Sequence, residues 1–462
     1  MTGNVQPPFD TLAPYRGRWV ALVRHRVAGV GAGAAQAYRA AKVVCPKDRP
    51  QLFFVDETGV AHVQPDDFSI WFEHPLLRQV ADIWQRQGQE AYLVGGGVRD
   101  GLLGRFDVEA DLDLLVPRNA LEAARHLADA LRAAYYPLDP RRDVGRVVLP
   151  DHRYLDIAAY RGDTLPEDLQ DRDFTINAMI IRLDAGAPCL LDPLDGQADL
   201  RRGIIRVASG KAITNDPLRT VRAVRLAARL GFTIEPDTRR RIEKGAAGLK
   251  AVSGERLRDE MLKLLATDQP GTAVAMLGQL KILPHLLPEA LAMAGVEQSP
   301  PHHLPVFEHT LLAMDSWSGL ATLDDPRLAA LTPLKAELQA YLQTELAGNV
   351  SRAALMPLVL LLHDTGKPQT FSRGSDGRIH FWRHPQVGAD IARQVMDRWH
   401  FSGQATRFVT TAVRHHMRPL LLSHQPRASR RAIHRLLEAA GDAAPALALL
   451  SLMDHLATYR PG

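Results

Sequence analysis

The pattern of apolar and polar positions divides the chain into an N-terminal part of mixed strands and helices and a long helical remainder. Within residues 1–60, short apolar runs predict a small module of β-β-α-β order. Its elements are expected at Trp19–Val23, Val27–Val30, Ala34–Val43 and Gln51–Val55. No residue set in this module suggests catalysis, so we interpret it as an accessory module, followed by a linker and a helix over residues 61–88.

Mixed α/β periodicity continues from Gln89 to about residue 200. The short elements expected there are a helix at Leu121–Ala134 and strands at Tyr92–Val94, Leu112–Val116, Gly145–Leu149 and Tyr154–Ala159. After Asn215 the apolar spacing is helical almost throughout, with Pro or Gly at the breaks. We therefore predict an α+β fold, with a mixed α/β head at 89–200, a helical neck and body at 201–300 and an all-α domain at 301–462.

Composition agrees with a folded protein of several domains. The 462 residues are 46% hydrophobic and 23% charged, which excludes wholesale disorder and collagen-like repeats. The longest apolar runs fall far short of the ~20 residues that a membrane helix needs, and the N-terminus lacks a signal-peptide pattern. Cys45 and Cys189 form no CxxC pair, which argues against a disulfide scaffold or a thiolate zinc site. We expect a cytoplasmic protein with no membrane partner.

Charge and histidine content add two hints about chemistry. The formal net charge of +4 permits a polyanionic partner but suits a slightly basic enzyme equally well. Many of the 18 histidines fall between His302 and His455. This clustering indicates metal or acid–base chemistry in the C-terminal part.

The first candidate site begins at a glycine-rich turn, Leu93–Asp100, between a predicted strand and a predicted helix. Glycines let the backbone approach a phosphate, and a helix N-terminus offers N–H groups to an anion. Arg99 would add positive charge. Many tight turns contain glycine, so this turn alone is weak evidence for phosphate binding.

Three carboxylates on predicted strands form the second part of this site. Asp111 and Asp113 are two residues apart and point to one face, and Asp156 lies within another apolar strand. Neighbouring carboxylates repel unless a cation compensates, and Mg²⁺ suits oxygen ligands and nucleotide phosphates. Three carboxylates are typical of two-metal phosphoryl transfer. A solvated strand face with ordinary salt bridges explains the Asp111/Asp113 pair equally well.

A helix with a charged first turn begins after Asn215. Pro217 suits the first helical position, which makes Asp216 a candidate N-cap, and Arg219 and Arg222 lie three apart on one helix face. In the functional interpretation the carboxylate accepts from the exocyclic amine of a base, and the guanidinium groups donate to its ring acceptors. A cap followed by a solvated basic face is the alternative.

Taken in order, the motifs LVGGGVRD, DLDLLV, RDFTINAM, DPLDGQADL and DPLRTVRAVRLAARLGF resemble the class II tRNA nucleotidyltransferase and bacterial poly(A) polymerase family. The resemblance covers roughly 89–265. It implies that the catalytic metals are bound by Asp111 and Asp113, with Asp156 as the third carboxylate. It implies nucleotide contacts from a larger set: Gly96, Arg99, Arg172, Asn177, Asp216, Arg219 and Arg222.

Within that set, the resemblance makes Asp216 and Arg219 the protein template that selects CTP or ATP, in competition with the capping role of Asp216. Two departures from the family pattern matter. Asn215 stands where an acidic residue usually precedes the DPLR motif. The segment Ile157–Asp171 is shorter than the flexible loop that helps CCA-adding and A-adding members switch from C to A. The short segment favours CC addition without excluding the complete CCA reaction.

A second candidate site is a series of His and Asp residues in the C-terminal part. His363 and Asp364 close an apolar helix, where polar groups must be paired or coordinated. The order H…HD…H…H…D resembles the HD metal-dependent phosphohydrolase superfamily. By that resemblance one metal is bound by His309, His363, Asp364 and Asp454. The remaining residues, which complete a second metal site or contact phosphate, are His384, His415 and Lys367.

Together the resemblances predict a tRNA 3′-end nucleotidyltransferase fused to an HD-type phosphohydrolase. It would use CTP and ATP, Mg²⁺ in the head, and Mg²⁺ or a divalent transition metal in the HD domain. Its partner would be tRNA or another RNA 3′ end, with no DNA partner expected. The alternatives within the family are a complete CCA-adding enzyme, an A-adding specialist and a poly(A) polymerase. From other classes, the alternatives are an HD phosphohydrolase whose head only binds nucleotide, and a non-catalytic RNA-binding adaptor.

Overall fold

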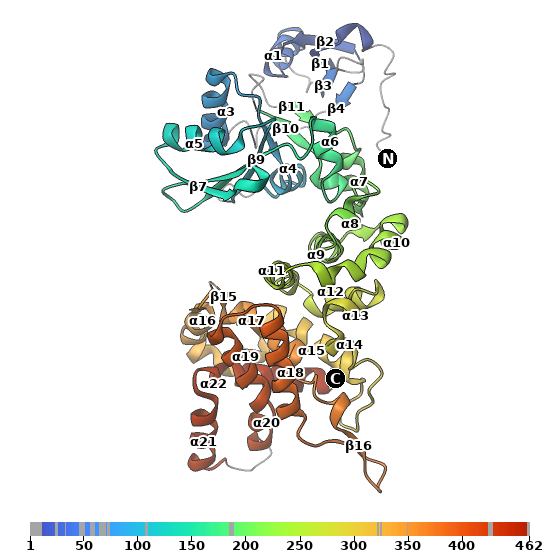
Figure 1. The fold of residues 1–462 in the computed structure, drawn as a ribbon, viewed down its shortest axis with the longest axis vertical. Helices are drawn as coiled ribbons and strands as arrows, with labels where there is room; N and C mark the ends of the chain where they lie inside the picture. Colours follow the sequence, from blue (N-terminus) through green and yellow to red (C-terminus); the bar gives the residue numbers. More distant parts are fainter. Residues whose placement is uncertain are drawn as a thin grey trace. The chain divides into compact units, whose positions relative to one another are not determined.

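The computed structural model describes residues 12–23, 26–32, 34–45, 51–55, 61–63, 71, 74–106, 110–183, 189–320, 323, 326–348, 350–423 and 428–459. The chain forms two compact units, Met1–Ala212 and Ile213–Gly462. The first unit holds the two larger sheets and the second is mainly helical (Figure 1). The predicted α+β class is confirmed, while the predicted domain boundaries near 200 and 300 stay predictions.

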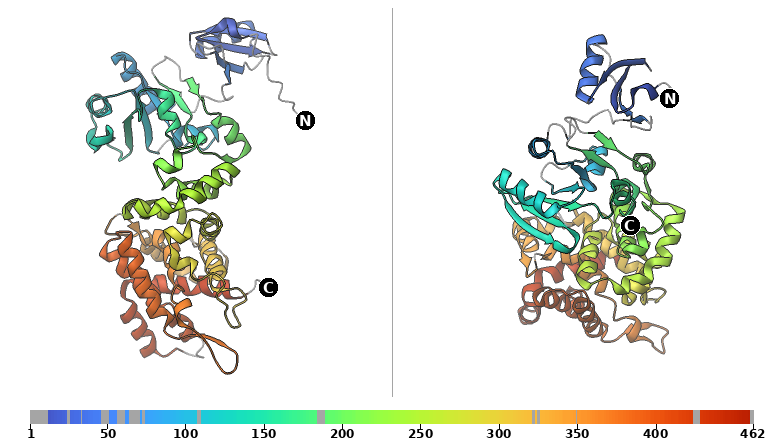
Figure 2. Two further views of the ribbon diagram at one scale, coloured as in Figure 1. Left: turned by 45° about the vertical axis from the view of Figure 1, so that its right-hand side comes forward. Right: turned by 45° about the horizontal axis from the view of Figure 1, so that its top comes forward.

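The N-terminal module is an antiparallel sheet with the strand order β2-β1-β3-β4 and one helix, α1, packed on it (Figure 2). Its elements are β1 (Arg18–Val23), β2 (Arg26–Gly31), α1 (Ala34–Val44), β3 (Gln51–Val55) and β4 (Ala61–Val63). Trp19 and Ala21 face Ala37 and Ala41 of α1 in one buried cluster. The predicted β-β-α-β order is confirmed, and β4 extends it by one strand.

The head is built on a seven-stranded sheet of order β11-β10-β5-β6-β9-β8-β7. Its strands are β5 (Tyr92–Val94), β6 (Leu112–Val116), β7 (Ala134–Asp139), β8 (Val144–Val148), β9 (Tyr154–Ala159), β10 (Ile180–Arg182) and β11 (Cys189–Leu191). The other elements of this unit are α3 (Pro75–Gln87), α4 (Gly96–Leu102), α5 (Ala120–Leu131), α6 (Leu165–Gln170), α7 (Gly196–Arg202) and β12 (Ile204–Ile205). β6 and β9 run parallel to each other.

Sequence analysis missed β7, β10 and β11 and extended the predicted helix Leu121–Ala134 too far. Helix α5 ends when Arg132 adopts a left-handed conformation, with φ 53°, and β7 begins two residues later. All six residues of β7 are exposed or half-buried because it lies at the sheet edge, so no apolar alternation marks it. Strands β10 and β11 have three residues each, too few to show a period.

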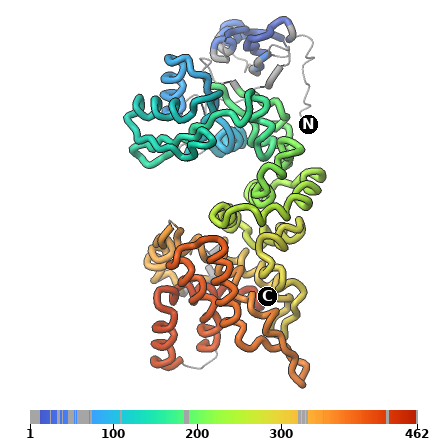
Figure 3. Tube along the Cα trace, in the orientation of Figure 1, coloured from blue at the N-terminus to red at the C-terminus, as the bar shows by residue number. Residues whose placement is uncertain are grey.

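The second unit is almost wholly helical (Figure 3). Its neck and body helices are α8 (Ala212–Asn215), α9 (Arg219–Leu230), α10 (Pro236–Gly245), α11 (Gly254–Leu265), α12 (Pro270–Gln279), α13 (Leu283–Leu286) and α14 (Pro288–Leu291), with the short strand β13 (Thr233–Ile234). The helices that follow are α15 (Val306–Leu320), α16 (Lys335–Gln343), α17 (Arg352–Leu362), α18 (His384–Arg398), α19 (Gly403–His415), α20 (Met417–Ser423), α21 (Arg430–Ala440) and α22 (Ala444–Thr458). Two hairpins pair β14 (Glu345–Leu346) with β15 (Val350–Ser351), and β16 (Phe371–Arg373) with β17 (Ile379–Phe381).

The core of the C-terminal helices forms around α17, whose residues from Leu355 to Leu362 are all buried. By length and composition, the helical run Arg430–Thr458 is long and apolar enough to cross a membrane, a test that core helices also pass. A short 3-10 turn at Gly441 interrupts this run, and α22 then packs on α15, α17 and α19. Core packing therefore accounts for the apolar residues of α22.

Candidate functional site

The three predicted carboxylates of the head meet on neighbouring strands. Asp113 of β6 and Asp156 of β9 are direct register partners. Asp111 precedes β6, and its Oδ1 accepts a hydrogen bond from the Tyr154 backbone N–H at 2.8 Å, at the start of β9. The Asp113 side chain is exposed, whereas its two strand neighbours are buried. The parallel pairing therefore gathers the three carboxylates at one place in the sheet.

Arg146 of β8, which sequence analysis missed, balances one of these charges. It donates to Asp156 from Nε at 2.7 Å and from Nη2 at 2.8 Å. The Asp113 side chain reaches solvent, but protein atoms surround most of its carboxyl group, and this burial raises its pKa. The negative charge of Asp156 raises the pKa further. The three carboxylates therefore fit a hard cation such as Mg²⁺, which would relieve this repulsion.

The glycine-rich turn lies beside the carboxylates. Gly95 has φ +74°, and a Cβ placed on it would lie 3.4 Å from Asp113 Oδ2. Helix α4 begins at Gly96 directly afterwards. The turn therefore brings bare backbone to the metal-ligand candidates, as the phosphate-binding interpretation requires.

Arg99 and Asn177, both predicted to bind nucleotide, belong to one hydrogen-bond network. Arg99 is buried, donating from Nη1 to Asn177 Oδ1 at 2.7 Å and from Nε and Nη2 to Asp100 at 2.8 Å. Asn177 in turn donates from Nδ2 to Asp173 Oδ1 at 3.0 Å. The network holds α4 against the segment after Arg172, so these residues are positioned before any ligand binds.

Arg172 lies at the end of the short segment that sequence analysis compared with a flexible loop. Its Nε donates to Asp168 Oδ2 at 3.0 Å, and Asp168 Oδ1 accepts from the Arg161 N–H at 3.1 Å. The segment starts with the last residues of β9 and ends with helix α6, which begins with a capping box formed by Thr164 and Glu167. This segment is therefore a compact turn and helix tied at both ends.

Asp216, Arg219 and Arg222 lie at the start of α9, in the second unit. Asp216 Oδ1 accepts from the Leu218 N–H at 3.3 Å, and Oδ2 accepts from Arg256 Nη2 at 2.7 Å. The N-cap of α9 is Leu218, so Asp216 closes the turn before the helix and is not the N-cap that the sequence predicted. Arg219 is buried. Arg222 is half-buried, and its Nε lies 3.6 Å from Oε2 of the buried Glu260.

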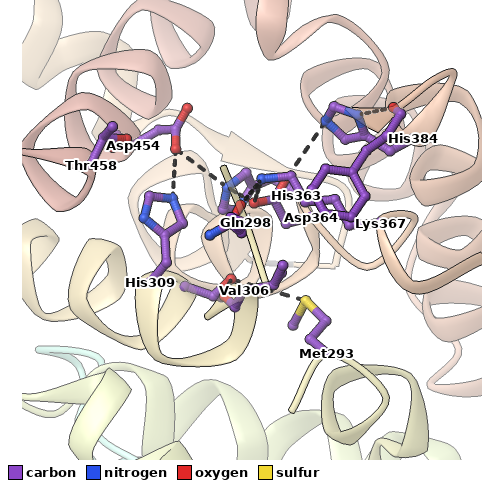
Figure 4. Close-up of polar contacts among 12 residues, drawn as sticks. Met293, Gln298, Val306, His309, His363, Asp364, Lys367, His384, Asp454 and Thr458 are labelled. Carbon is purple, nitrogen blue, oxygen red and sulfur yellow. Dashed lines mark hydrogen bonds and ion pairs between the residues drawn. The ribbon is translucent and has the colours of Figure 1, made fainter. Parts of the chain in front are cut away.

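The HD residues converge in the second unit (Figure 4). His309 Nε2 lies 2.8 Å from Asp454 Oδ1, and His363 Nε2 lies 3.2 Å from Asp364 Oδ2. His384 approaches Asp364 from the other side, with its Nε2 3.6 Å from Oδ1. This approach needs Gly366, because a Cβ there would lie 2.2 Å from the His384 carbonyl oxygen.

Lys367, the predicted phosphate contact, is almost fully buried in the same cluster. Its Nζ lies 2.6 Å from Asp364 Oδ2 and donates to Gln298 Oε1 at 2.7 Å. Asp454 is firmly placed despite lying near the end of the chain, because α22 packs in the core.

The second histidine of the pair on α19 is the one that enters the cluster, which corrects the prediction of His415. His416 Nε2 lies 3.8 Å from Asp364 Oδ1 and 3.2 Å from His384 Nε2, whereas His415 is absent from the ligand groups. Successive helical residues point about 100° apart, so only one can face the cluster. The buried stripe through Val409 and Val413 was the signal, since His416 continues it at i+7 and i+3.

Three histidines are oriented as metal ligands by backbone carbonyls. His363, His384 and His416 each donate from Nδ1 to the carbonyl three residues earlier, at 2.7, 2.8 and 2.7 Å. A carbonyl only accepts, so Nδ1 of each ring carries a proton and Nε2 is the ring atom that faces the cluster.

Electrostatics show why a metal fits this cluster. Burial lowers the pKa of His416 to about 3 and also lowers that of His384, so both rings are neutral and their Nε2 lone pairs face each other. Burial alone would lower the pKa of His363, but the Asp364 and Asp454 carboxylates outweigh it and raise the pKa to about 10. The two carboxylates therefore favour a positive charge beside His363, which a divalent cation would supply.

His302 is a candidate ligand that sequence analysis did not select. It forms a possible metal-binding group with His309 and Asp454, and the rings of the two histidines are 5.1 Å apart. Burial lowers the pKa of His302 to about 4, which keeps the ring neutral and able to ligate. Its position seven residues before His309 on an irregular segment gave no periodic signal.

Comparisons with known proteins give family matches for three parts of the chain. Family models match for the "Poly A polymerase head domain" at 151–206, the "Probable RNA and SrmB-binding site of polymerase A" at 231–293 and the "HD domain" at 338–459. The chain is 35% identical over 371 residues to an A-adding tRNA nucleotidyltransferase of Deinococcus radiodurans, covering 79% of this chain and 75% of that protein. It is 33% identical over 376 residues to a CC-adding tRNA nucleotidyltransferase of Thermus thermophilus, covering 80% and 77%.

Solved structures share the fold at lower sequence identity. The Thermotoga maritima CCA-adding enzyme complexed with tRNA is 23% identical, with a TM-score of 0.53, over 81% of this chain and 78% of that one. A tRNA-processing enzyme in an apo form is 21% identical, with a TM-score of 0.58, over 82% and 89%. The fold of the chain is therefore that of these structures.

Proposed function

The chain belongs to the tRNA nucleotidyltransferase family of enzymes, and on this premise we propose that it adds CMP from CTP to the 3′-hydroxyl of tRNA. The observation that carries the proposal is the register pairing of Asp113 with Asp156, beside Asp111. The RNA 3′-oxygen bonds to the α-phosphorus, and the bond to pyrophosphate breaks. Mg²⁺ bound by Asp111 and Asp113 would activate the hydroxyl and offset the charge of the leaving pyrophosphate.

The chain's own residues bind and orient the substrates around this centre. Arg146 holds the Asp156 carboxylate by two hydrogen bonds. Gly96 has no side chain, so the triphosphate can approach its backbone. Arg99 and Asn177, joined by a hydrogen bond, contact the sugar and the phosphates. Arg172 adds positive charge near the carboxylates. Its guanidinium charge lowers the pKa of Asp113 and so partly offsets the effect of burial.

Asp216 and Arg219, at the start of α9, select the base of the incoming nucleotide. The ion pair with Arg256 holds the Asp216 carboxylate in one orientation, and burial holds Arg219. A fixed carboxylate and a fixed guanidinium can accept from and donate to the edge of one base, which is what a protein template needs. Arg222, held near Glu260, supports this pair.

The compact segment between β9 and Arg172 supports CC addition. Its capping box and the Arg172–Asp168 contact leave little chain free to rearrange between two nucleotides. The relatives include both A-adding and CC-adding enzymes, so sequence identity does not discriminate between them.

Extension of tRNA transcripts lacking the CCA end, with CTP, ATP and Mg²⁺, is expected to stop after two added C residues. The physical reason is that a short, tied segment cannot reset the template for ATP. Product lengths are read at single-nucleotide resolution. Addition of C, C and A contradicts the expectation and indicates a complete CCA-adding enzyme. Extension of transcripts ending in CC by one A, or a long tail from ATP alone, indicates the A-adding or poly(A) alternative.

We also propose that the HD cluster hydrolyses a phosphoester. The opposed lone pairs of His384 and His416 and the shared carboxylate Asp364 support two metal sites bridged by one residue. Divalent metals there, Mg²⁺ or a transition metal, would supply the Lewis acidity that activates water for attack on phosphorus. The buried Lys367 keeps a positive charge beside the bridging carboxylate.

The variant His416→Ala is expected to lose about one equivalent of divalent metal per chain, because His416 supplies one of the inward Nε2 atoms. The matched control is His415→Ala, one residue earlier and outside the ligand groups, which is expected to keep the wild-type metal content. Metal is counted by inductively coupled plasma mass spectrometry after dialysis. Equal metal loss in both variants, or loss only in His415→Ala, contradicts the assignment.

A further inference from the structure

The hairpin β16–β17 projects from the helical unit (Figures 1 and 3). At its end the exposed Trp382 stacks on the half-buried His380. Trp382, directly after β17, is 73% exposed. Its ring stacks on that of His380, with centroids 5.4 Å apart and planes within 17°. We name this pair the Trp382–His380 platform. An exposed aromatic ring contributes little to the core and leaves a face on which a planar ligand can stack.

The platform flanks the HD cluster. Trp382 precedes His384 by two residues, so their Cα atoms are at most about 7 Å apart. Phe381 lies between His380 and Trp382 in the sequence. Its carbonyl accepts the Nδ1–H of His384 at 2.8 Å, and its ring lies 5.5 Å from Lys367 Nζ. The same short stretch of chain therefore presents the rings to solvent and orients a metal ligand.

The charge of the hairpin favours an anionic ligand. Residues 371–383 contain three arginines and one aspartate, a net charge of +2 with His380 neutral. Arg373 pairs with Glu297 at 3.2 Å, and Arg378 lies 4.0 Å from Asp376. Arg383, next to Trp382, has no ion pair among the residues that the structure describes. Stacking rings beside cations are the combination by which proteins hold unpaired bases and their phosphates.

A protein partner fits these observations less well. A stable protein interface needs roughly 800 Å² from each partner, far more than two rings on a short hairpin offer. A single base and its phosphate need no more than one aromatic face and neighbouring positive charge.

We propose that the Trp382–His380 platform binds an unpaired base, so that the phosphoester presented to the HD cluster belongs to a nucleotide unit at a single-stranded RNA end. The proposal rests on the proposed hydrolase activity of the HD cluster and names its substrate class. The base stacks on Trp382, and the adjoining phosphate reaches the metal ligands behind Phe381.

The test compares Trp382→Ala and Trp382→Phe with the wild-type full-length protein. For hydrolysis of adenosine 3′-monophosphate by the metal-loaded protein, Trp382→Ala is expected to raise KM by about 5- to 150-fold, as the loss of one stacked base predicts. The KM for glycerol 2-phosphate, which has no base, is expected to stay unchanged, and Trp382→Phe is expected to keep most of the affinity. Because Trp382 is largely exposed, both variants should keep the wild-type Tm.

A second experiment measures nucleotide binding and does not depend on hydrolysis. Adenosine 3′-monophosphate is titrated into the metal-free protein, and tryptophan fluorescence is followed. A base on Trp382 quenches its emission, so wild type should lose fluorescence that Trp382→Phe does not lose. Tyr136→Ala, which removes an exposed ring from β7 in the other unit, is the matched control and should match wild type in both readouts.

Three results would overturn the proposal: a wild-type KM for adenosine 3′-monophosphate in Trp382→Ala, an equal rise for both substrates, or equal quenching in wild type and Trp382→Phe. If the wild-type protein hydrolyses neither compound, the hydrolase proposal fails separately, and the fluorescence titration alone decides the role of the platform. Binding of a protein at the platform, without binding of nucleotide, would also contradict the proposal.

Discussion

Replacing Asp113 with asparagine is expected to lower the rate of CMP incorporation by about 10³-fold or more, since a catalytic metal contributes several kcal/mol to the transition state. Asp113 lies opposite Asp156 in the sheet, and its side chain is exposed, as that of Asp111 is. The measurement is single-turnover incorporation of labelled CMP into tRNA that lacks its CCA end. Phosphoester hydrolysis by the HD cluster should stay at the wild-type level.

The stability of the same variant has an expected sign. Burial and the Asp156 charge raise the pKa of Asp113 in the folded state, so the ionised group disfavours folding, and this cost is present above the raised pKa. A neutral asparagine removes that cost at pH 7, so Tm should equal or exceed the wild-type value. Asp151→Asn, an exposed carboxylate paired with Arg153, is the control that should keep full incorporation. Substantial incorporation by Asp113→Asn would refute the metal-ligand assignment.

Replacing Asp364 with asparagine is expected to abolish hydrolysis by the HD cluster and to remove most of its metal. Asp364 belongs to two of the three candidate ligand groups, and its oxygens lie near His363, His384 and Lys367. Metal content and phosphoester hydrolysis are measured on the same preparation. Incorporation of CMP should be unaffected, because the head carboxylates lie in the other unit.

The metal-free Asp364→Asn protein is also expected to be less stable, by about 3–5 kcal/mol, because Lys367 and the raised-pKa His363 lose their buried counter-charge. Asp390→Asn, an exposed carboxylate on α18 that pairs with Arg414 at 3.2 Å, is the control for both readouts. Wild-type metal content in Asp364→Asn would refute the bridging role. If neither Asp113→Asn nor Asp364→Asn changes any activity, both site assignments are wrong.

Sequence analysis selected all three carboxylates of the head site and most residues of the HD cluster, because their signals are local. Asp111 and Asp113 share a face through the two-residue period of a strand, and His363 and Asp364 end an apolar helix. The order of motifs then placed the chain in a family that the relatives confirm. The role of each site residue stays a prediction that the variants above test.

Sequence analysis did not predict contacts between residues that lie far apart in the chain. Arg146 pairs with Asp156 only because β8 folds back beside β9, and the strand pattern alone does not show which charges will meet. His302 reaches Asp454 across most of the second unit's chain length. The helical period could have predicted His416 in place of His415, but only once the buried face of α19 was known.

The sequence by itself determined the family, the α+β class and the residue types of both sites, because strand and helix periods and ordered motifs are encoded within a few residues of one another. Only the tertiary structure decided which side chains meet: Asp113 with Asp156 across a parallel pair, and His384 with His416 from two different helices. Such contacts depend on strand register and on the rotation of each helix about its axis. Both are set by packing between segments far apart in the chain, so no local pattern records them.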